Sequence, residues 1–215
     1  MILNPLEIER ESFRIISQEF LKRGYSFREE ELPLVMRAVH ATGDISLAEA
    51  LVFHPRAVEA GLEALSQGTL VVTDVEMIAV GINKKFLRIL GARTVCLVNA
   101  EEIKAEAQAL GCTRAYCALK RALALPEKKI IVVGNAPTAL LAVLDHLHEG
   151  GNPPELVIGV PVGFVGAAEY KERLRRQDQV PFITLPGTRG GTPVAVALSN
   201  ALLKLAVERC GSHVT

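Results

Sequence analysis

The chain has 215 residues, and its 24 Lys and Arg residues balance its 24 Asp and Glu residues. This balance gives no global charge that would attract nucleic acid or an anionic membrane surface. A chain of this length can bury roughly 70% of its unfolded surface without disulfide or metal support, so one domain spanning residues 1–215 is expected. The sequence shows neither an apolar run of about 18 residues nor a signal peptide, so no membrane span is expected.

The four cysteines form no C-x-x-C pair, which favours reduced thiols and a cytoplasmic location. These residues are Cys96, Cys112, Cys117 and Cys210.

Residues 1–66 are predicted to form a helical extension. Asn4 and Pro5 are typical of a helix cap and first turn. Phe13, Ile16 and Phe20 then recur on one helical face. Further helices are predicted at residues 32–41, 46–53 and 55–66.

Residues 67–210 are predicted to form a βα sheet core, because short apolar runs alternate with helical stretches. Such alternation indicates a three-layer α/β fold, with a five-stranded parallel sheet covered by helices on both faces. The predicted strands are residues 70–73, 94–98, 130–133, 156–160 and 182–185. The predicted helices are residues 75–90, 101–124 with a break near Gly111, 138–148, 165–176 and 193–208.

Three glycine-rich turns follow predicted strands, at residues 134–138, 159–166 and 186–193. Their backbone N–H groups would suit carboxylates or phosphates. Ligands of open α/β sheets bind beyond the carboxyl ends of the strands, so we expect a ligand site at this rim. For any one of these three turns taken alone, the alternative is a tight turn that binds no ligand. None matches a dinucleotide or phosphate-loop fingerprint, which argues against a nucleotide-dependent enzyme.

His40 is the histidine best placed for chemistry. It falls near the end of the helix predicted at residues 32–41, with Arg37 one turn before and Asp44 one turn after. A histidine in such a position can act as a general acid or base. The alternative is a helix-end histidine that bonds to carbonyl groups of the last turn.

Other candidates for chemistry are less specific. Asp74 and Glu76 could be acid–base partners, although helix caps are the commoner use of such residues. Arg114 and Lys120 could meet an anion or lie on a solvated helix face.

Several blocks of the sequence resemble the precorrin-8X methylmutase family, which is also known in a cobalt-precorrin-8 form. The similarity covers nearly the whole chain. One departure is Thr192-Pro193, where the family usually has a serine followed by a small residue. The matching blocks are ESF at 11–13, RAVHATG at 37–43, DVEMIAVG at 74–81, TR at 113–114, GNAPTAL at 134–140 and GVPVGFVGAAE at 159–169.

The resemblance implies a flavodoxin-like sheet with strand order 2-1-3-4-5, and a homodimer with its active site near the subunit interface. It also implies an isomerase of cobalamin biosynthesis that moves a methyl group from C11 to C12 of the precorrin-8 macrocycle. The product would be hydrogenobyrinate, or cobyrinate for the cobalt form. No cofactor, methyl donor or protein-bound metal would take part. His40 would be the proton donor and acceptor, and the substrate would contact Ser12, Arg37, Thr113, Arg114, Asn135 and Gly163.

The residue chemistry agrees with these expectations. A concerted methyl shift needs no nucleophile, but a placed proton can make the migrating system electron-poor. Arg37 and Arg114 suit the carboxylates that fringe the macrocycle. The apolar face of the first helix favours a homodimer, with Ser12 close to the partner's cleft. The alternative function is a tetrapyrrole-binding or carrier protein without turnover.

Overall fold

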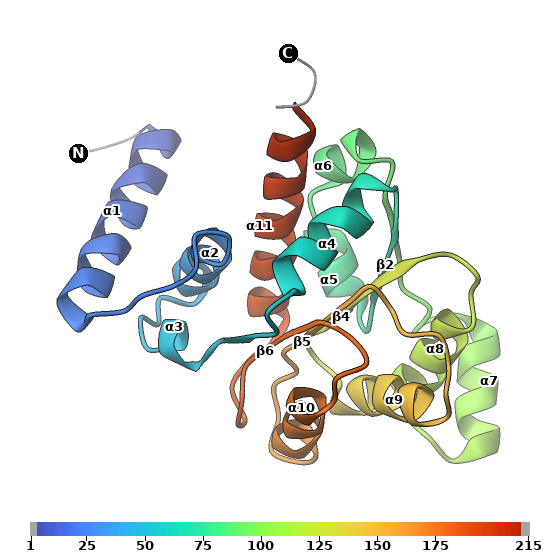
Figure 1. Ribbon diagram of the computed structural model, residues 1–215. Helices are drawn as coiled ribbons and strands as arrows, with labels where there is room; N and C mark the ends of the chain where they lie inside the picture. Colours follow the sequence, from blue (N-terminus) through green and yellow to red (C-terminus); the bar gives the residue numbers. More distant parts are fainter. Residues whose placement is uncertain (1–3, 212–215) are drawn as a thin grey trace.

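The computed structural model describes residues 4–211. It contains a six-stranded sheet with helices on both faces (Figure 1). The strands are β1 (Val52–Phe53), β2 (Leu70–Thr73), β3 (Arg93–Val95), β4 (Lys129–Val133), β5 (Leu156–Gly159) and β6 (Phe182–Thr184). The helices are α1 (Pro5–Arg23), α2 (Leu32–Thr42), α3 (Leu47–Ala50), α4 (Ala57–Ser66), α5 (Glu76–Gly81), α6 (Lys84–Ile89), α7 (Glu101–Leu110), α8 (Arg114–Leu123), α9 (Pro137–His148), α10 (Ala167–Arg176) and α11 (Thr192–Gly211).

The strands lie in the order β1-β6-β5-β4-β2-β3. Strands β2 to β6 pair in parallel and, numbered among themselves, follow the order 2-1-3-4-5. The sixth strand corrects the five-stranded prediction. Val52 and Phe53, expected at the end of a helix, pair antiparallel with Thr184 and Ile183 instead. Two residues are too few to show the alternation that identifies a strand.

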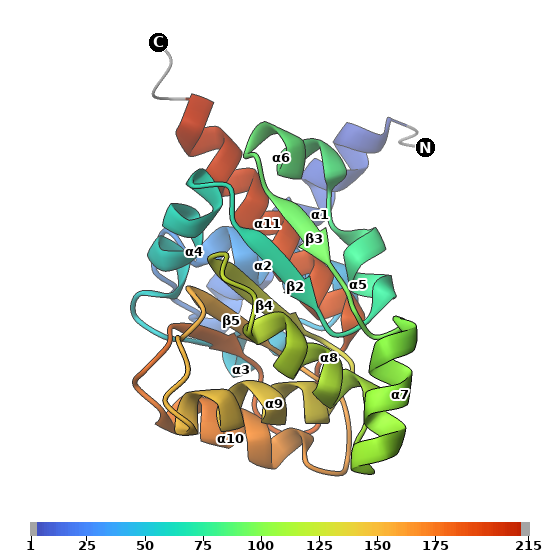
Figure 2. The ribbon, with the colours of Figure 1, turned by 90° about the vertical axis from the view of Figure 1, so that its right-hand side faces the viewer.

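The parallel strands are buried on both faces, which explains their continuous apolar character. In β4, Ile130 and Val132 pack in the cluster that includes α4 and α11, whereas Ile131 and Val133 pack against α8 and α9. Helices α7 to α10 therefore cover one face of the sheet, and α4, α5, α6 and α11 cover the other (Figure 2).

The first helices lie outside α11. Helix α2 packs along α11, and α1 packs against α2 (Figure 1). Asn4 caps α1 by accepting a hydrogen bond from the backbone N–H of Leu6, as expected, and Gly24 ends it with a φ of 69°. Ile16 and Phe20 are buried, so α1 contacts the body through the predicted face.

Two helix predictions need correction. The helix predicted at residues 46–53 is the single turn α3 followed by β1. The helix predicted at residues 75–90 is divided into α5 and α6, because Ile82 is extended and Asn83 caps a new helix. The Asn83 side chain accepts hydrogen bonds from the N–H groups of Lys85 and Phe86. Asparagine is a common helix cap, but the apolar spacing continues across Asn83 and favoured one uninterrupted helix.

Cys112 and Cys117 lie in contact at the start of α8, but their Cα atoms are 7.2 Å apart, which is beyond the usual span of a disulfide. Cys96 and Cys210 are free, and reduced thiols stay the prediction for all four cysteines. No helix within residues 4–211 is long and apolar enough to cross a membrane.

Candidate active site

The exposed face of α2 carries His40 and Arg37, one helical turn apart. The opposite face is buried through Leu34, Val35, Ala38 and Val39, which turns these two polar side chains outward.

Phe13 of α1 contacts both of these side chains. The ring centroids of Phe13 and His40 are 5.2 Å apart, and the Arg37 guanidinium carbon lies 4.7 Å from the Phe13 centroid. Within residues 4–211, the ring nitrogens of His40 make no hydrogen bond. They are therefore open to a ligand, which argues against the alternative in which His40 bonds to helix-end carbonyls.

Arg37 already has a carboxylate partner. Its Nη1 donates to Oε1 of Glu9 at 2.6 Å, and this hydrogen bond holds the pKa of the Glu9 carboxyl below its usual value. Ser12, one turn further along α1, donates its hydroxyl to the carbonyl of Ile8 at 2.9 Å. Ser12, Arg37 and His40 thus gather around Phe13, although Ser12 and Arg37 make contacts within the chain.

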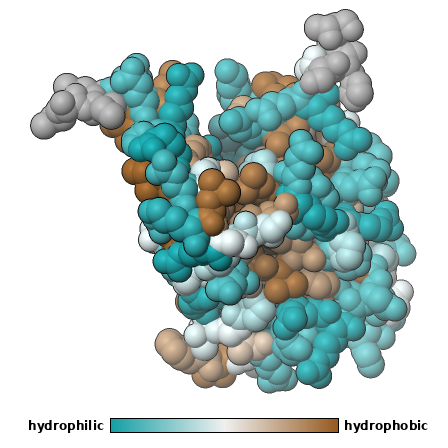
Figure 3. All heavy atoms as spheres, turned by 60° about the vertical axis from the view of Figure 1, so that its left-hand side comes forward, coloured by the Kyte–Doolittle hydropathy of each residue, from teal (hydrophilic) through white to brown (hydrophobic). Residues whose placement is uncertain are grey.

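Two grooves open on either side of Arg37. The larger, about 610 Å³, lies between α1, α2, α6 and α11, and the smaller, about 350 Å³, lies between α1, α2 and α11. Figure 3 shows the hollow between α1 and α11 with apolar side chains exposed in it. The larger groove is lined by Glu9, Arg37, Ala41, Asn83, Phe86, Pro193, Val196, Ala197, Asn200, Ala201 and Lys204. Pro193, the second residue of the Thr192-Pro193 pair noted in the sequence, lies in this wall.

Of the remaining predicted site residues, Asn135 and Gly163 lie on the turns after β4 and β5, whereas Thr113 and Arg114 begin α8, directly after α7. Thr113 caps α8 and shares a hydrogen bond of 2.7 Å with the hydroxyl of Thr138. The N–H of Gly163 donates to the carbonyl of Thr188 at 3.1 Å. Arg114 is exposed and makes no hydrogen bond or ion pair with the described residues, so its guanidinium is open to an anion.

The turn at residues 134–138, predicted to bind a ligand anion, already binds a carboxylate of the protein. Asp74 is fully buried, and its carboxylate accepts hydrogen bonds from the N–H groups of Gly134, Asn135 and Ala136 at 3.1, 2.8 and 2.7 Å. Burial raises the pKa of Asp74, and these three donors oppose that change. The expectation that this turn offers free N–H groups to a ligand is therefore wrong. The exposed residue Asn135 remains available through its side chain.

An ion pair connects the rim to the end of α2. Nη1 of Arg189, in the loop between β6 and α11, lies 3.0 Å from Oδ2 of Asp44. Asp44, which follows His40 by about one helical turn in the sequence, therefore has Arg189 as its ion-pair partner. Sequence reasoning missed the roles of Glu9 and Arg189, because their partners lie far away in the chain. For Asp74 it offered a cap as the commoner use, but it did not identify the turn at Gly134 as the partner. The one available signal was the position of Arg189 inside a glycine-rich turn.

An open histidine on α2 and an arginine on α8 that is unpaired within residues 4–211, carried by an α/β fold with a parallel sheet, would suit proton transfer on an anionic substrate. The comparisons with known proteins carry this further. Residues 7–205 match the family model described as precorrin-8X methylmutase. The chain belongs to the precorrin-8X methylmutase family, whose members are isomerases of cobalamin biosynthesis.

The similarity extends over nearly the full length of its relatives. The cobalt-precorrin-8 methylmutase of Priestia megaterium is 40% identical, over 96% of this chain and 90% of that protein. The precorrin-8X methylmutase of Pseudomonas aeruginosa is 39% identical, over 91% and 93%. The crystal structure of precorrin-8X methylmutase from Thermus thermophilus has 40% sequence identity and a TM-score of 0.86, over 94% of this chain and 97% of that one.

Proposed function

We propose that this protein is an isomerase that moves the methyl group at C11 of the precorrin-8 macrocycle to C12, yielding hydrogenobyrinate or its cobalt form, cobyrinate. The observation that carries the proposal is the state of His40. Its ring is exposed at the end of α2, lies with its centroid 5.2 Å from that of Phe13, and makes no hydrogen bond with residues 4–211. A general acid that approaches its substrate in this way needs no prior rearrangement of its own contacts.

His40 would donate a proton that draws electron density from the conjugated system next to C11. The C11–CH₃ bond breaks as the C12–CH₃ bond forms, and the double bonds shift accordingly. Because the reaction is an isomerisation, His40 takes a proton back when the migration is complete. The methyl group stays on the macrocycle throughout, so no nucleophile is required.

The arginines would hold the carboxylates that fringe the macrocycle. Arg37 borders both grooves and stands one turn from His40, and Arg114 is open at the rim. Charged hydrogen bonds of this kind fix orientation as well as affinity. Ser12, Thr113, Asn135 and Gly163 are proposed as further substrate contacts, at the edge of α1 and on the rim turns.

We also propose a single α/β domain of flavodoxin-like type that forms a homodimer. In support of one domain, a single apolar cluster joins Ile16 and Phe20 of the first helix, strands β2, β4 and β5, and residues of the last helix up to Ala206. In support of a dimer, α1 exposes the large apolar side chains of Leu6, Ile8 and Ile15. The proposed partner contact would bring Ser12 close to the second subunit's cleft.

The decisive experiment presents metal-free and cobalt-loaded precorrin-8 to the purified protein and follows the visible spectrum. Appearance of the corrin spectrum with either substrate supports the isomerase, and the faster substrate identifies the physiological form. Tight retention of precorrin-8 with an unchanged spectrum would instead support the tetrapyrrole carrier.

A further inference from the structure

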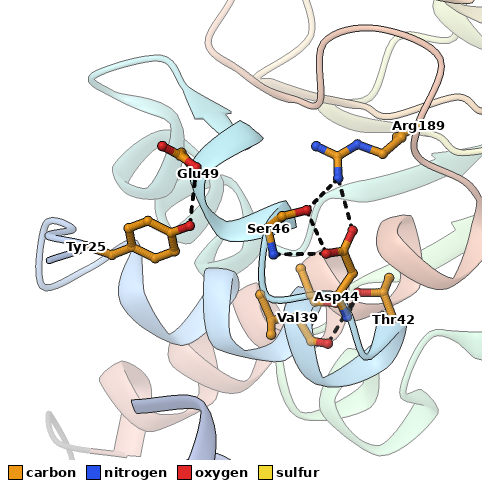
Figure 4. A network of polar contacts seen from close by, with 8 residues as sticks. Tyr25, Val39, Thr42, Asp44, Ser46, Glu49 and Arg189 are labelled. Atoms are coloured by element: carbon orange, nitrogen blue, oxygen red, sulfur yellow. Dashed lines mark hydrogen bonds and ion pairs between the residues drawn. The ribbon is translucent and has the colours of Figure 1, made fainter. Parts of the chain in front are cut away.

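Arg189 bridges two parts of the site that are 145 residues apart in the chain. Its Nη1 donates to Oδ2 of Asp44 and to Oγ of Ser46, each at 3.0 Å (Figure 4). Asp44 in turn accepts hydrogen bonds from the N–H and the hydroxyl of Ser46, at 2.9 and 2.7 Å. Three side chains thus form one closed set of contacts over the turn between α2 and α3.

Hydrogen bonds to α10 and to the loop after β5 fix the backbone around Arg189. Lys171, fully buried on α10, donates its Nζ to the carbonyl of Arg189 at 2.7 Å. The N–H of Gly191 donates to the carbonyl of Val160 at 2.8 Å, and a Cβ on Gly190 would collide with that same carbonyl. The loop that carries Arg189 is therefore held against the loop after β5, which carries Gly163.

The other end of the bridge controls the end of α2. Gly43 adopts a φ of 67° and ends the helix, and Asp44 follows directly. The N–H of Asp44 donates to the hydroxyl of Thr42 at 3.3 Å, so the turn is continuous with the last helical residue. His40 lies in that last turn. Since Phe13 is the only ring that contacts it among the described residues, the position of His40 depends on where this helix end is held.

Stability alone is a weak reason for the bridge. The side chains of Arg189 and Asp44 are 47% and 42% exposed, and ion pairs so exposed contribute little to folding. Positional accuracy is a stronger reason, because a displacement of about 1 Å in a catalytic group can slow a reaction by about 100-fold.

We infer that Arg189 is a positioning residue for the proposed methyl shift: its bridge to Asp44 and Ser46 sets the distance between His40 and the substrate-facing loops after β5 and β6. The inference rests on the proposed role of His40. Neither Arg189 nor Asp44 needs to touch the macrocycle for this purpose.

The test compares Arg189→Gln, Asp44→Asn and the double variant in single-turnover reactions at saturating precorrin-8. Each single variant should lower the rate by about 10-fold or more, with little change in product affinity or Tm. The double variant should be no slower than the slower single variant, because both changes remove the same contact. The exchanged pair Asp44→Arg with Arg189→Asp should recover part of the rate. Arg93→Gln is the matched control, since Arg93 pairs with Glu127 at 2.8 Å on the surface of the sheet edge.

A second measurement needs no turnover. Amide hydrogen exchange at residues 43–47 of the ligand-free protein should be faster in Arg189→Gln than in the wild type, and unchanged in Arg93→Gln. Unchanged exchange there, or a wild-type rate in both single variants, would overturn the inference. So would loss of product affinity in Arg189→Gln with a normal rate in Asp44→Asn, which is the result expected of a direct substrate contact. A fully active His40→Asn enzyme would instead overturn the proposed function, whatever the exchange result.

Discussion

The carboxylate of Asp74 caps the turn that begins at Gly134, with one oxygen bonded to Gly134 and the other to the next two N–H groups. An asparagine can present only one oxygen to these three donors. Asp74→Asn should therefore lower the free energy of unfolding by about 1–3 kcal/mol, as expected when a buried donor loses its acceptor. Urea denaturation measures this change. The control is the exposed Glu76→Gln of the same block, and equal stability of the two variants would contradict the capping role.

His40→Asn should lower kcat by about 10²–10⁴-fold, the usual range for a lost general acid or base. Product affinity should persist, because the histidine's contribution is greater in the transition state than in the ground state. Single-turnover rates and product titrations separate the two effects. His148→Asn, at the exposed end of α9, is the control. A His40→Asn or His40→Ala protein that isomerises at the wild-type rate would refute the assignment.

Arg37→Ala should weaken product binding by about 1.5–3 kcal/mol, the value of a hydrogen bond to a charged group. Glu9→Gln should act in the opposite direction. Glu9 neutralises Arg37 in the free protein, so its removal leaves the guanidinium to the substrate carboxylate. Fluorescence or absorbance titration with product compares both variants. If Glu9→Gln weakened binding as much as Arg37→Ala, Glu9 would instead be holding Arg37 in its binding position.

Lys171 should make stability depend on alkaline pH. Burial lowers its pKa from 10.5 to about 8, so between these values the unfolded chain binds more protons than the folded one. The stability contributed by this titration is complete above pH 10.5 and is lost as the pH falls through 8. Relative to Lys171→Met, the wild type should gain stability from pH 7 to pH 10, by at most about 3 kcal/mol. Thermal melts across this range test the slope, and the exposed Lys85→Met should leave it unchanged.

The homodimer proposal makes a simple prediction about mass. Light scattering at micromolar concentration should give twice the mass of the chain, and Ile15→Glu on the exposed face of α1 should reduce it to the monomer. Leu110→Glu, on α7 at the other face of the sheet, supplies the matched control because Leu110 is also exposed. A monomeric wild type would remove the support for a shared active site.

Local patterns predicted most of the secondary structure. The run at Ile130–Val133 was recognisable as a strand because both its faces are buried, and Pro137 marked the first turn of α9. By contrast, β1 escaped prediction because its pairing with β6 is decided by tertiary contacts. The break between α5 and α6 was hidden because the apolar spacing continues across Asn83.

In the candidate site too, contacts between residues close in the sequence could be predicted, and contacts between distant residues could not. Arg37 and His40 are three residues apart on one helix, so their proximity follows from helical geometry. The bond between Asp74 and the turn at Gly134 joins residues 60 apart, and that between Asp44 and Arg189 joins residues 145 apart. No spacing rule predicts such pairs. Asp74 was a candidate for acid–base chemistry, and the turn at Gly134 was a candidate for binding a ligand anion. In the structure, the Asp74 carboxylate itself binds this turn.

The packing of α2 on α11 has a consequence for the order of events during synthesis. The apolar face of α2, with Leu34 and Val39, leaves the ribosome more than 150 residues before Leu198 and Leu202 of α11, which belong to the same apolar cluster. At about 5–20 residues per second, that interval lasts about 8–30 seconds. Throughout it, the helix that carries His40 lacks the surface on which it rests. Both grooves beside α2 therefore form only with the last helix of the chain, and a product that ended before it would contain every proposed substrate contact without these grooves.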